Sequence, residues 1–491
     1  MINFLLEKQS NQKLSVLSYL IFCESKTANI VDIIKDLNLS EFLVTKAIKG
    51  IAADIETYKI QNLTIQLQEK KATLVLSETD SLHKLSWYYI NDSISFKLFD
   101  TIFKKSLTSL ESFAKQQFIS FSKAYLLKIE IEEELKKHGI QITSDLSFTG
   151  QESTVRFLLF QIYFTSFNGL SYPFSSTIEK IVTQFTQLIQ GLLTTKLSET
   201  QLLKLTFFSA ITFERIYQQH HVSFTEDEAF TLQNESSFTL AINDFFKEHT
   251  TMNDDFIQSE TQFLQIFLIS EKLIMVDKEN ILFKKNNVFL KIESMTLLFF
   301  DSFTQYFKKP LSQKLTTALE KEIFRINYAF IFIRPFYLKS YFKINDPFIK
   351  ECYPDFHAFS TLFISTLSNQ ISDLEEPHKD CLLHDYLFAL IQIIPNTYFN
   401  EAIHICVDFS SGPIYNHFIG EKIKLFKFFN IRIERYLSKQ TDIYLSDILL
   451  PNIHCKTLIW NTLPLASDWE SLGNQIIRIN NEKLKKRMPH M

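Results

Sequence analysis

Apolar residues near the start of the chain recur first at helical spacing and then in strand-like alternation. The helical spacing covers residues 12–23, 28–37 and 41–58, and the alternation covers the runs LTIQLQ and ATLVLS. Ser40 interrupts the spacing before the third helix, which it can cap by accepting a hydrogen bond from an early backbone N–H. Three short helices followed by a strand pair predict a winged helix-turn-helix over residues 1–85.

The third helix of this unit has two distinct faces. We expect its apolar stripe to face the core, and that stripe consists of Val44, Ile48, Ile51 and Ile55. The opposite face, which can enter a major groove of DNA, carries Glu41, Thr45, Lys46 and Lys49. Thr45, Lys46 and Lys49 are therefore the candidate DNA-binding residues of the first unit, through hydrogen bonds to base edges or contacts to phosphates.

A second unit of the same kind follows in residues 109–152, where the pattern predicts a helix, a tight turn, a longer helix and a short hairpin. Ser120 is the expected cap of the longer helix, after Phe118 and Ile119, which we expect to be buried. The inward stripe of that helix is Ala124, Leu127, Ile131 and Leu135. Its outward candidates for DNA contact are Ser122, Lys123, Tyr125 and Lys128. The second helix-turn-helix is placed at residues 86–151.

Longer amphipathic helices dominate the middle of the chain. A first group is expected at residues 154–166, 176–193, 199–219 and 237–247. A second group is expected at residues 259–273, 287–307, 311–333, 347–369 and 378–393. The similar length and order of the helices predict two all-α bundles, over residues 152–258 and 259–395.

The sequence changes character again after residue 395. AIHICVDF is a short apolar run with strand character, SSGPIYNH follows as a turn, and a helix is expected at residues 418–429. Further strand candidates alternate with helical segments, which favours a small α/β domain with a mostly parallel sheet over residues 396–491. The chain of 491 residues is thus predicted to be mainly α and multidomain, because it is too long for a single core.

Composition argues against several classes of function. Five cysteines are scattered without CxxC spacing, which indicates neither a disulfide framework nor a zinc site. The chain has 8 glycines and lacks GxxxxGKS/T, GxGxxG, HExxH and GxSxG motifs. The acidic run EIEEEL is better explained as a solvated helix face than as a metal site. We therefore expect no enzyme activity, catalytic residue, metal or cofactor. The scattered cysteines fit a reducing cytoplasm, and the lack of a long apolar run predicts that the protein does not span a membrane.

Charge leaves two interpretations of the helix-turn-helix pair open. Residues 1–150 contain 18 lysines, no arginine and 18 acidic residues, whereas DNA-binding domains are usually basic because phosphate neutralisation supplies most non-specific affinity. The tandem capped units favour double-stranded DNA as the partner, bound weakly and with strong salt dependence. The alternative is a protein-interaction or phospho-acceptor module without sequence-specific DNA binding.

The segment FISFSKAYLLKIEIEEELKKHGIQIT, followed by FTGQESTVRFLLFQIYF, resembles the Mga and AtxA family of regulators from low-GC Gram-positive bacteria. The similarity lies in the Ser-led helix, the GxE after the wing and Arg156, whereas Leu126 stands where we expect a basic residue. Over the whole chain the resemblance implies tandem helix-turn-helix domains, two phosphotransferase-system regulation domains and a C-terminal EIIB-like domain. It also implies a transcriptional regulator, usually an activator of virulence or carbohydrate-linked genes, that forms a homodimer through the C-terminal domain.

Phosphorylation of histidines by phosphocarrier proteins of the phosphotransferase system is a further implication of the resemblance. In the first bundle the candidates are His220 and His221, at the end of a helix that contains Arg215, and in the second bundle the first candidate is His384. A phosphohistidine adds negative charge and can rearrange a helical interface through pairs with Lys and Arg. The alternative is that these histidines are ordinary surface or core residues.

The C-terminal domain differs from an active EIIB subunit, which carries its phosphorylated Cys or His in the loop after its first strand. Here that loop reads DFSSGPIYNH, and Cys406 and His404 lie inside the expected strand. We therefore expect this domain to serve in association and to have no phosphoryl transfer of its own.

Overall fold

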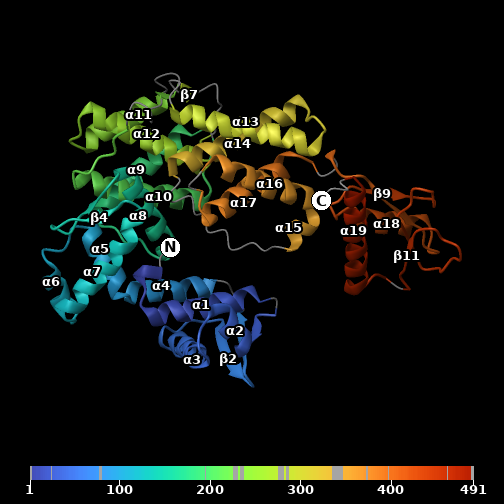
Figure 1. Cartoon of the computed structure of the whole chain (residues 1–491), viewed down its shortest axis with the longest axis horizontal. Coiled ribbons are helices and arrows are strands. Elements are labelled where there is room, and N and C mark those ends of the chain that lie inside the picture. Colours follow the sequence, from blue (N-terminus) through green and yellow to red (C-terminus); the bar gives the residue numbers. More distant parts are fainter. Residues whose placement is uncertain are drawn as a thin grey trace. The chain divides into compact units, whose positions relative to one another are not determined.

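The computed structural model describes residues 3–23, 25–76, 80–193, 195–224, 231–232, 237–274, 281–282, 287–333, 347–371, 374–395, 398–461 and 463–487. The chain folds into two compact units, Met1–Met275 and Val276–Met491, and both are mainly helical (Figure 1). The mainly helical fold and the C-terminal parallel sheet predicted from the sequence are confirmed. Among the described helices, none has the length and apolar character needed to cross a bilayer.

The first unit begins with a winged domain. Its elements are η1 (Asn3–Leu5), α1 (Lys8–Phe22), β1 (Thr27–Asn29), α2 (Ile30–Leu37), α3 (Glu41–Thr57), β2 (Leu63–Gln68) and β3 (Lys71–Leu76). The three strands form an antiparallel sheet in the order β1-β3-β2. Glu69 and Lys70 join β2 to β3 with left-handed backbone at both positions, which a tight two-residue hairpin turn requires. The predicted helices and strand pair are confirmed, and β1 adds a third strand.

A helix-turn-helix with a short hairpin follows. Its elements are α4 (Asp80–Asp92), α5 (Ile94–Phe103), α6 (Leu110–Gln116), α7 (Phe121–Lys136), β4 (Gln141–Ile142) and β5 (Phe148–Thr149). The predicted helix pair and hairpin are present, whereas α4 and α5 were not predicted. Phe118, which we expected to be buried, is 96% exposed. It lies in the turn between α6 and α7 with a φ of 54°, a left-handed conformation that reverses the chain sharply and leaves this side chain in solvent.

Longer helices complete the first unit. They are α8 (Glu152–Phe167), α9 (Ser176–Leu192), α10 (Glu199–Tyr217), α11 (Ser237–His249) and α12 (Asp254–Ser270), with β6 (Thr231–Leu232) between α10 and α11. α10 packs against α8 and α9, and α11 packs against α9 and α12. The sequence pattern placed residues 259–273 at the start of the second bundle. The structure places α12 in the first unit, where its Glu260 is bound by Arg156 of α8.

The second unit contains a helical bundle. Its elements are β7 (Ile281–Leu282), α13 (Asn287–Phe307), α14 (Gln313–Ile333), α15 (Pro347–Cys352), α16 (Pro354–Gln370) and α17 (Glu376–Ile393). The long helices pack on one another through aromatic rings, such as Phe299 of α13 against Phe363 of α16. The single helix predicted over residues 347–369 is broken at Tyr353. Pro354 explains the break, because a proline disfavours helical backbone at the residue before it.

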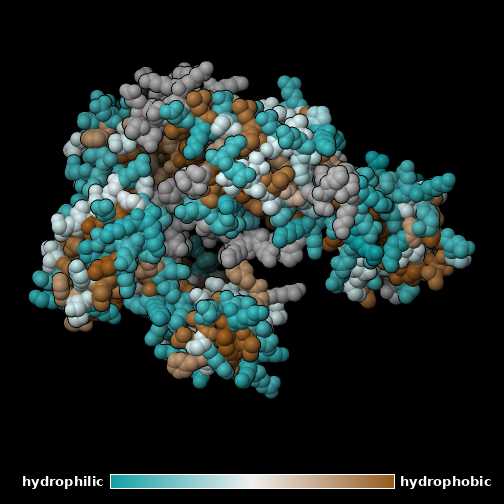
Figure 2. All heavy atoms as spheres, in the orientation of Figure 1, coloured by the Kyte–Doolittle hydropathy of each residue, from teal (hydrophilic) through white to brown (hydrophobic). Residues whose placement is uncertain are grey.

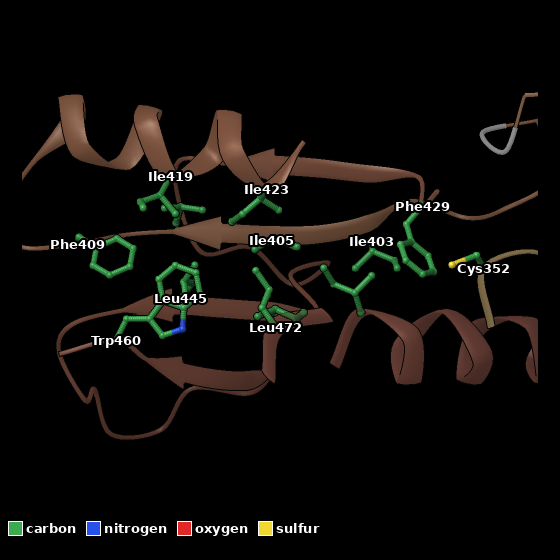
Figure 3. Close-up of a cluster of buried hydrophobic side chains, with 13 residues drawn as sticks. Cys352, Ile403, Ile405, Phe409, Ile419, Ile423, Phe429, Leu445, Trp460 and Leu472 are labelled. Carbon is green, nitrogen blue, oxygen red and sulfur yellow. The ribbon is translucent and has the colours of Figure 1, made fainter. Parts of the chain in front are cut away.

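A parallel four-stranded sheet lies near the C-terminus. Its domain comprises β8 (Ile403–Val407), α18 (Pro413–Ile423), β9 (Ile431–Glu434), β10 (Ile443–Ser446), β11 (Lys456–Ile459) and α19 (Ala466–Arg487). The strand order is β11-β10-β8-β9, with every neighbouring pair parallel. Figure 3 shows its core, in which Ile405 and Leu445 of the strands pack with Ile419 of α18 and Leu472 of α19. Cys352 of α15 belongs to the same buried cluster.

The start of α18 differs from the prediction. The run SSGPIYNH was expected to be a turn followed by a helix at residues 418–429, whereas α18 begins at Pro413. Proline is favourable in the first turn of a helix, because the N–H that it lacks has no helical partner there. Gly412 precedes it with a φ of 92°, so the turn is confined to the residues between β8 and Gly412.

Candidate nucleic-acid interface

Ser40 and Ser120 start the two candidate reading helices in the same way. The Ser40 hydroxyl accepts a hydrogen bond from the backbone N–H of Leu43 at 3.3 Å, and the Ser120 hydroxyl accepts one from Lys123 at 3.2 Å. Both predicted caps are confirmed. A cap pairs an N–H group that the helix itself leaves unpaired. The two caps therefore stabilise the N-terminal ends of α3 and α7, which are the ends that would enter a DNA groove.

The two faces of α3 are as predicted. Its inward residues Val44, Ile48, Ile51 and Ile55 are all buried. On the outward face Lys46 and Lys49 are exposed and Thr45 is partly exposed. These three residues and Lys13 of α1 line a groove of about 580 Å³ between the two helices. The outward face of α3 is therefore open and carries positive charge.

The wing adds two lysines beside α3 that sequence reasoning did not select. Lys70, at the tip of the hairpin, has a side chain that is 76% exposed and lies 3.7 Å from Glu41. Lys71 starts β3 and is exposed. An ion pair this exposed contributes little to stability, so Lys70 is available to a polyanion. The signal in the sequence was the Glu-Lys-Lys run between the two strands.

On α7 most of the predicted inward stripe is buried. Ala124, Ile131 and Leu135 are buried, and Leu127 is partly buried. α5, α6 and η1 pack against this helix. The outward candidates that are exposed, as predicted, are Ser122, Lys123 and Tyr125.

Lys128 departs from the expected outward position. Its side chain is 19% exposed, and its Nζ binds the Glu132 carboxylate one turn later at 3.2 Å. The spacing of apolar residues could not show this, because the pair depends on where the neighbouring helices cover α7. Lys128 is therefore less accessible to a phosphate than Lys123.

The outward face of α7 is more apolar than the sequence prediction assumed. Phe121 and Tyr125 are each 49% exposed and stack with ring centroids 6.3 Å apart, and Leu126 is 58% exposed. Phe42, next to the cap of α3, is 72% exposed. Figure 2 shows hydrophobic atoms at the surface of the region that Figure 1 labels α5 to α7. The signal in the sequence was the presence of apolar residues outside the inward stripe.

A buried network of charged residues connects the second hairpin to the first bundle. Arg156 of α8 donates to the Glu260 carboxylate at 2.5 and 2.7 Å and to Glu152 at 2.9 Å. Arg215 of α10 donates to Glu152 at 2.7 and 2.9 Å and to the carbonyl oxygen of Phe148 in β5 at 3.1 Å. Burial opposes ionisation of Glu152, but the hydrogen bonds and charges of the two arginines outweigh it and lower the Glu152 pKa.

The candidate histidines of the first bundle lie beside this network. The carbonyl oxygen of His220 accepts a hydrogen bond from Arg156 at 2.9 Å, and the His221 ring stacks on Phe256 with centroids 4.5 Å apart. Burial and the Arg215 charge lower the pKa of His220 to about 4, and burial lowers the pKa of His221. Both rings are therefore neutral near pH 7, which is the form of imidazole that can act as a nucleophile.

The candidate in the second bundle is more enclosed. His384 of α17 is 8% exposed, and its Nδ1 lies 2.6 Å from the carbonyl oxygen of Asp380. Nδ1 is the donor in that hydrogen bond, because a carbonyl oxygen only accepts. The ring therefore has little access to a protein-sized phosphoryl donor.

A buried asparagine, Asn327, lies in the middle of the second bundle. The Asn327 side chain donates to the hydroxyl of Thr296 at 2.9 Å and accepts from the hydroxyl of Tyr386 at 2.5 Å. Asn327 and Tyr386 are fully buried. The cluster is therefore neutral and joins α13, α14 and α17.

The loop after β8 is occupied by a carboxylate of the domain itself. Asp447 accepts hydrogen bonds from the backbone N–H of Ser410 at 2.8 Å and from the Ser410 hydroxyl. Cys406 is buried in β8, and burial raises the pKa of its thiol to about 12. His404 binds the Glu434 carboxylate at 2.8 Å. These contacts support the expectation that neither Cys406 nor His404 accepts a phosphoryl group.

A family model described as the Mga helix-turn-helix domain matches residues 78–163 of this chain. The chain carries an Mga helix-turn-helix domain. The resemblance inferred from α7 and its wing is confirmed. The matched region also includes α5 and the whole of α4, which begins six residues before the predicted start at residue 86. It extends into α8 as far as Tyr163, so it contains Glu152 and Arg156 of the buried network.

Two curated proteins of Bacillus anthracis are distantly similar to the chain that carries this Mga domain. The capsule synthesis positive regulator AcpA is 22% identical over 225 residues, and the capsule synthesis positive regulator AcpB is 20% identical over 219 residues. The matched part is 45% of this chain and of AcpA, and 44% of this chain and of AcpB, so the match spans less than half of each relative. The Mga domain and the names of both relatives support the expectation that the chain is not an enzyme.

Proposed function

We propose that this protein is a DNA-binding transcriptional regulator and, as the names of AcpA and AcpB suggest, an activator. The observation that carries the proposal is the pair of Ser-capped helices, α3 and α7, whose outward faces lie in solvent, the second within the Mga domain. A helix that projects its first turns in this way fits the major groove of double-stranded DNA. We propose more specifically that the genes it controls are virulence or carbohydrate-linked genes.

The proposed contacts divide into two kinds. The DNA-binding residues are Thr45, Lys46, Lys49, Ser122, Lys123, Tyr125 and Lys128. The lysines contact phosphates, which position the helices, and Thr45, Ser122 and Tyr125 contact base edges, which select sequence. Lys128 contributes only when it leaves Glu132, to which it is bound in the free protein.

A binding titration against a duplex from upstream of the gene, repeated over a salt series, tests the proposal. We expect saturable binding whose affinity falls as salt rises, because phosphate contacts release counterions. Removing Lys46 and Lys49 together, or Lys123 alone, should lower the slope of log affinity against log salt by about 1 for each phosphate that is no longer neutralised. Lys137→Ala is the matched control, because Lys137 caps the far end of α7 and binds Glu134. A slope equal to that of the wild type in both the Lys46/Lys49 and the Lys123 variants contradicts the proposed interface.

We propose further that phosphocarrier proteins of the phosphotransferase system modify His220 or His221 and thereby adjust DNA binding. The support is the position of both residues beside Arg156, whose network also holds Phe148 of the wing through Arg215. A phosphoryl group at this position competes with Glu260 for an arginine, because charge-assisted hydrogen bonds to phosphate are strong. His384 is the candidate in the second bundle.

Incubation with the general phosphotransferase proteins and labelled phosphoenolpyruvate tests this modification. We expect labelled phosphate on the wild-type chain. The double variant His220→Ala/His221→Ala should lack the labelled phosphate that the first bundle carries. His384→Ala isolates the second bundle, and His417→Ala, at an exposed position of α18, is the control. Absence of label from both bundles removes the proposal.

We also propose that the C-terminal domain forms a homodimer. Its surface exposes large apolar side chains, namely Ile414, Tyr436, Leu449, Leu463 and Leu465, each more than 60% exposed. Hydrophobic atoms are visible over this domain in Figure 2. Several large apolar side chains exposed on one small domain favour an interaction site there. Leu449→Glu should give a monomer in light scattering, whereas Leu170→Glu, at an exposed site of the first unit, should not.

A protein-interaction module without sequence-specific DNA binding is the second candidate. The balance of lysine and acidic residues in residues 1–150 favours it, because that balance provides little attraction to DNA. The salt titration separates the two candidates. Absence of saturable binding to any duplex at low salt favours the interaction module.

A further inference from the structure

The first two turns of α7 expose a surface that is mainly apolar. Phe121, Tyr125 and Leu126 are each about half exposed or more, at 49%, 49% and 58%. Between them lie Ser122 and Lys123, which are exposed and can form hydrogen bonds. Single exposed apolar residues are ordinary, but a contiguous group at the reading end of a helix indicates a contact surface.

The fold holds this surface in place before any ligand arrives. The rings of Phe121 and Tyr125 stack at an interplanar angle of 25°, one helical turn apart. Ser120 caps the helix directly before them, and Ala124 and Ile131 anchor the opposite side of the helix in the core. The stacked rings of Phe121 and Tyr125 therefore lose less side-chain freedom than isolated rings would when this surface is covered.

The chemistry of the major groove restricts what an apolar surface can recognise there. Each base pair presents hydrogen-bond donors and acceptors, and thymine alone adds an apolar group, its C5 methyl. Donors and acceptors covered by phenyl or isobutyl groups would lose water without gaining a partner, which costs free energy. Methyl groups covered by the same side chains lose only unfavourable contact with water.

We propose that α7 reads thymine methyl groups, so that the protein selects A·T-rich major grooves whose methyls contact Phe121, Tyr125 and Leu126. This inference rests on the DNA-binding function proposed above and names the base feature that gives it specificity. Leu126 has the central role, because it is the most exposed of the three and stands where we expected a basic residue.

DNA fits this surface better than a second protein does. Lys123 and the positive N-terminal end of α7 lie on the same turn as Phe121, and both attract phosphates. An apolar protein partner would have to remove water from Lys123 without neutralising its charge. The N-terminal winged domain repeats the arrangement on α3, where Phe42 is 72% exposed beside Lys46 and the methyl-bearing Thr45.

Replacement of thymine by deoxyuridine tests the proposal directly. The probe is the duplex bound in the salt titration, synthesised once with thymine and once with deoxyuridine, which pairs with adenine in the same way and lacks the methyl group. Wild-type affinity should fall roughly fourfold for each methyl group removed from the interface, because this is the change in affinity that burial of one carbon group produces. Introduction of 5-methylcytosine at a weakly bound site should raise affinity by a similar factor.

Variants of α7 assign the effect to its residues. In Leu126→Ala and Phe121→Ala the ratio of thymine to deoxyuridine affinity should fall towards one. Lys123→Ala is the matched control from the same turn, since it should weaken both duplexes equally and keep the wild-type ratio. All three side chains are exposed, so thermal unfolding should match that of the wild type and confirm an intact fold.

Each outcome separates this inference from the function on which it rests. Equal wild-type affinity for the thymine and deoxyuridine duplexes overturns methyl reading and leaves DNA binding in place. Binding to neither duplex overturns the DNA-binding function itself. A wild-type ratio that persists in the Leu126 and Phe121 variants overturns the role of α7, and a changed oligomeric state in those variants shows that another copy of the chain covers the surface.

Discussion

Each helical bundle contains a buried polar cluster, and the two clusters differ in kind. In the first, Arg156 and Arg215 bind Glu152 and Glu260 in a network of charges. In the cluster between α13, α14 and α17 of the second, Asn327 joins two hydroxyl groups without any charge. A buried charge that loses its partner costs far more folding free energy than a buried hydroxyl that loses its hydrogen-bond partner. Disruption of the first cluster should therefore destabilise the protein more than disruption of the second.

The clusters also differ in what they touch. The charged network ends on backbone oxygens at both sides, Phe148 in the wing of the Mga domain and His220 beyond the end of α10. Arg156, Glu152 and Arg215 thus link the backbone at His220 to the backbone of the wing. The neutral cluster connects side chains within its own bundle, which suits it to holding helices together. The charged network, unlike the neutral cluster, therefore contacts the wing of the Mga domain.

Removal of one charge from the first network is the strongest test of this comparison. Glu260→Gln leaves buried Arg156 without its bidentate partner, and we expect the free energy of unfolding to fall by about 3–5 kcal/mol. Amide hydrogen exchange in peptides of α8 and α12, followed in urea, measures the loss. Glu199→Gln at the exposed start of α10 is the control and should change stability by about 0.5 kcal/mol or less. Unchanged protection of α8 in Glu260→Gln contradicts the assigned role.

The neutral cluster should respond less. Asn327→Leu removes the acceptor of the buried Tyr386 hydroxyl and should cost about 1–3 kcal/mol, with the loss confined to the second unit. Addition of Tyr386→Phe should recover part of that stability, because removal of both partners leaves no unpaired hydroxyl. The same urea and exchange measurement applies. A double variant less stable than Asn327→Leu alone speaks against this hydrogen bond as the source of the effect.

Acidification gives the smallest expected effect. The folded state lowers the pKa of His220 from 6.5 to about 4, through burial and the Arg215 charge. The unfolded chain therefore takes up the proton first, so the stabilisation by neutral His220 is complete above pH 6.5 and declines as pH falls through 6.5 towards 4. His220→Asn lacks this titration and should lose less melting temperature than wild type between about pH 7 and pH 5. Parallel losses in the two proteins would exclude His220 as a contributor.

The features predicted correctly from the sequence depend on neighbours along the chain. The caps at Ser40 and Ser120 need only the N–H groups of the next turn, and the buried stripe of α3 follows from helical spacing. The bounds of α13 follow from spacing as well. The Mga resemblance was also local, because it lay in α7, the wing and the start of α8.

The features that were missed depend on residues distant in sequence. Lys128 lies where packing around α7 covers most of its side chain, and α12 joins the first unit, where Arg156 of α8 binds its Glu260. The hydrophobicity of Phe118 predicts a core residue, yet Phe118 occupies the left-handed turn position that Asn38 occupies in the N-terminal winged domain. The exposed face of α7 is apolar because Phe121, Tyr125 and Leu126 lie outside its buried stripe. Helical spacing identifies the buried face of a helix and does not show that the opposite face is also apolar.

The buried Cys352 has a consequence for where the sheet domain can be cut from the chain. Its side chain lies among Ile403 and Phe429 in the core of that domain, although α15 precedes the boundary suggested by the sequence at residue 396. A fragment that starts at residue 396 would carry an unfilled gap at this end of its interior. Recombination that transplants the sheet domain into another protein must therefore bring α15 with it.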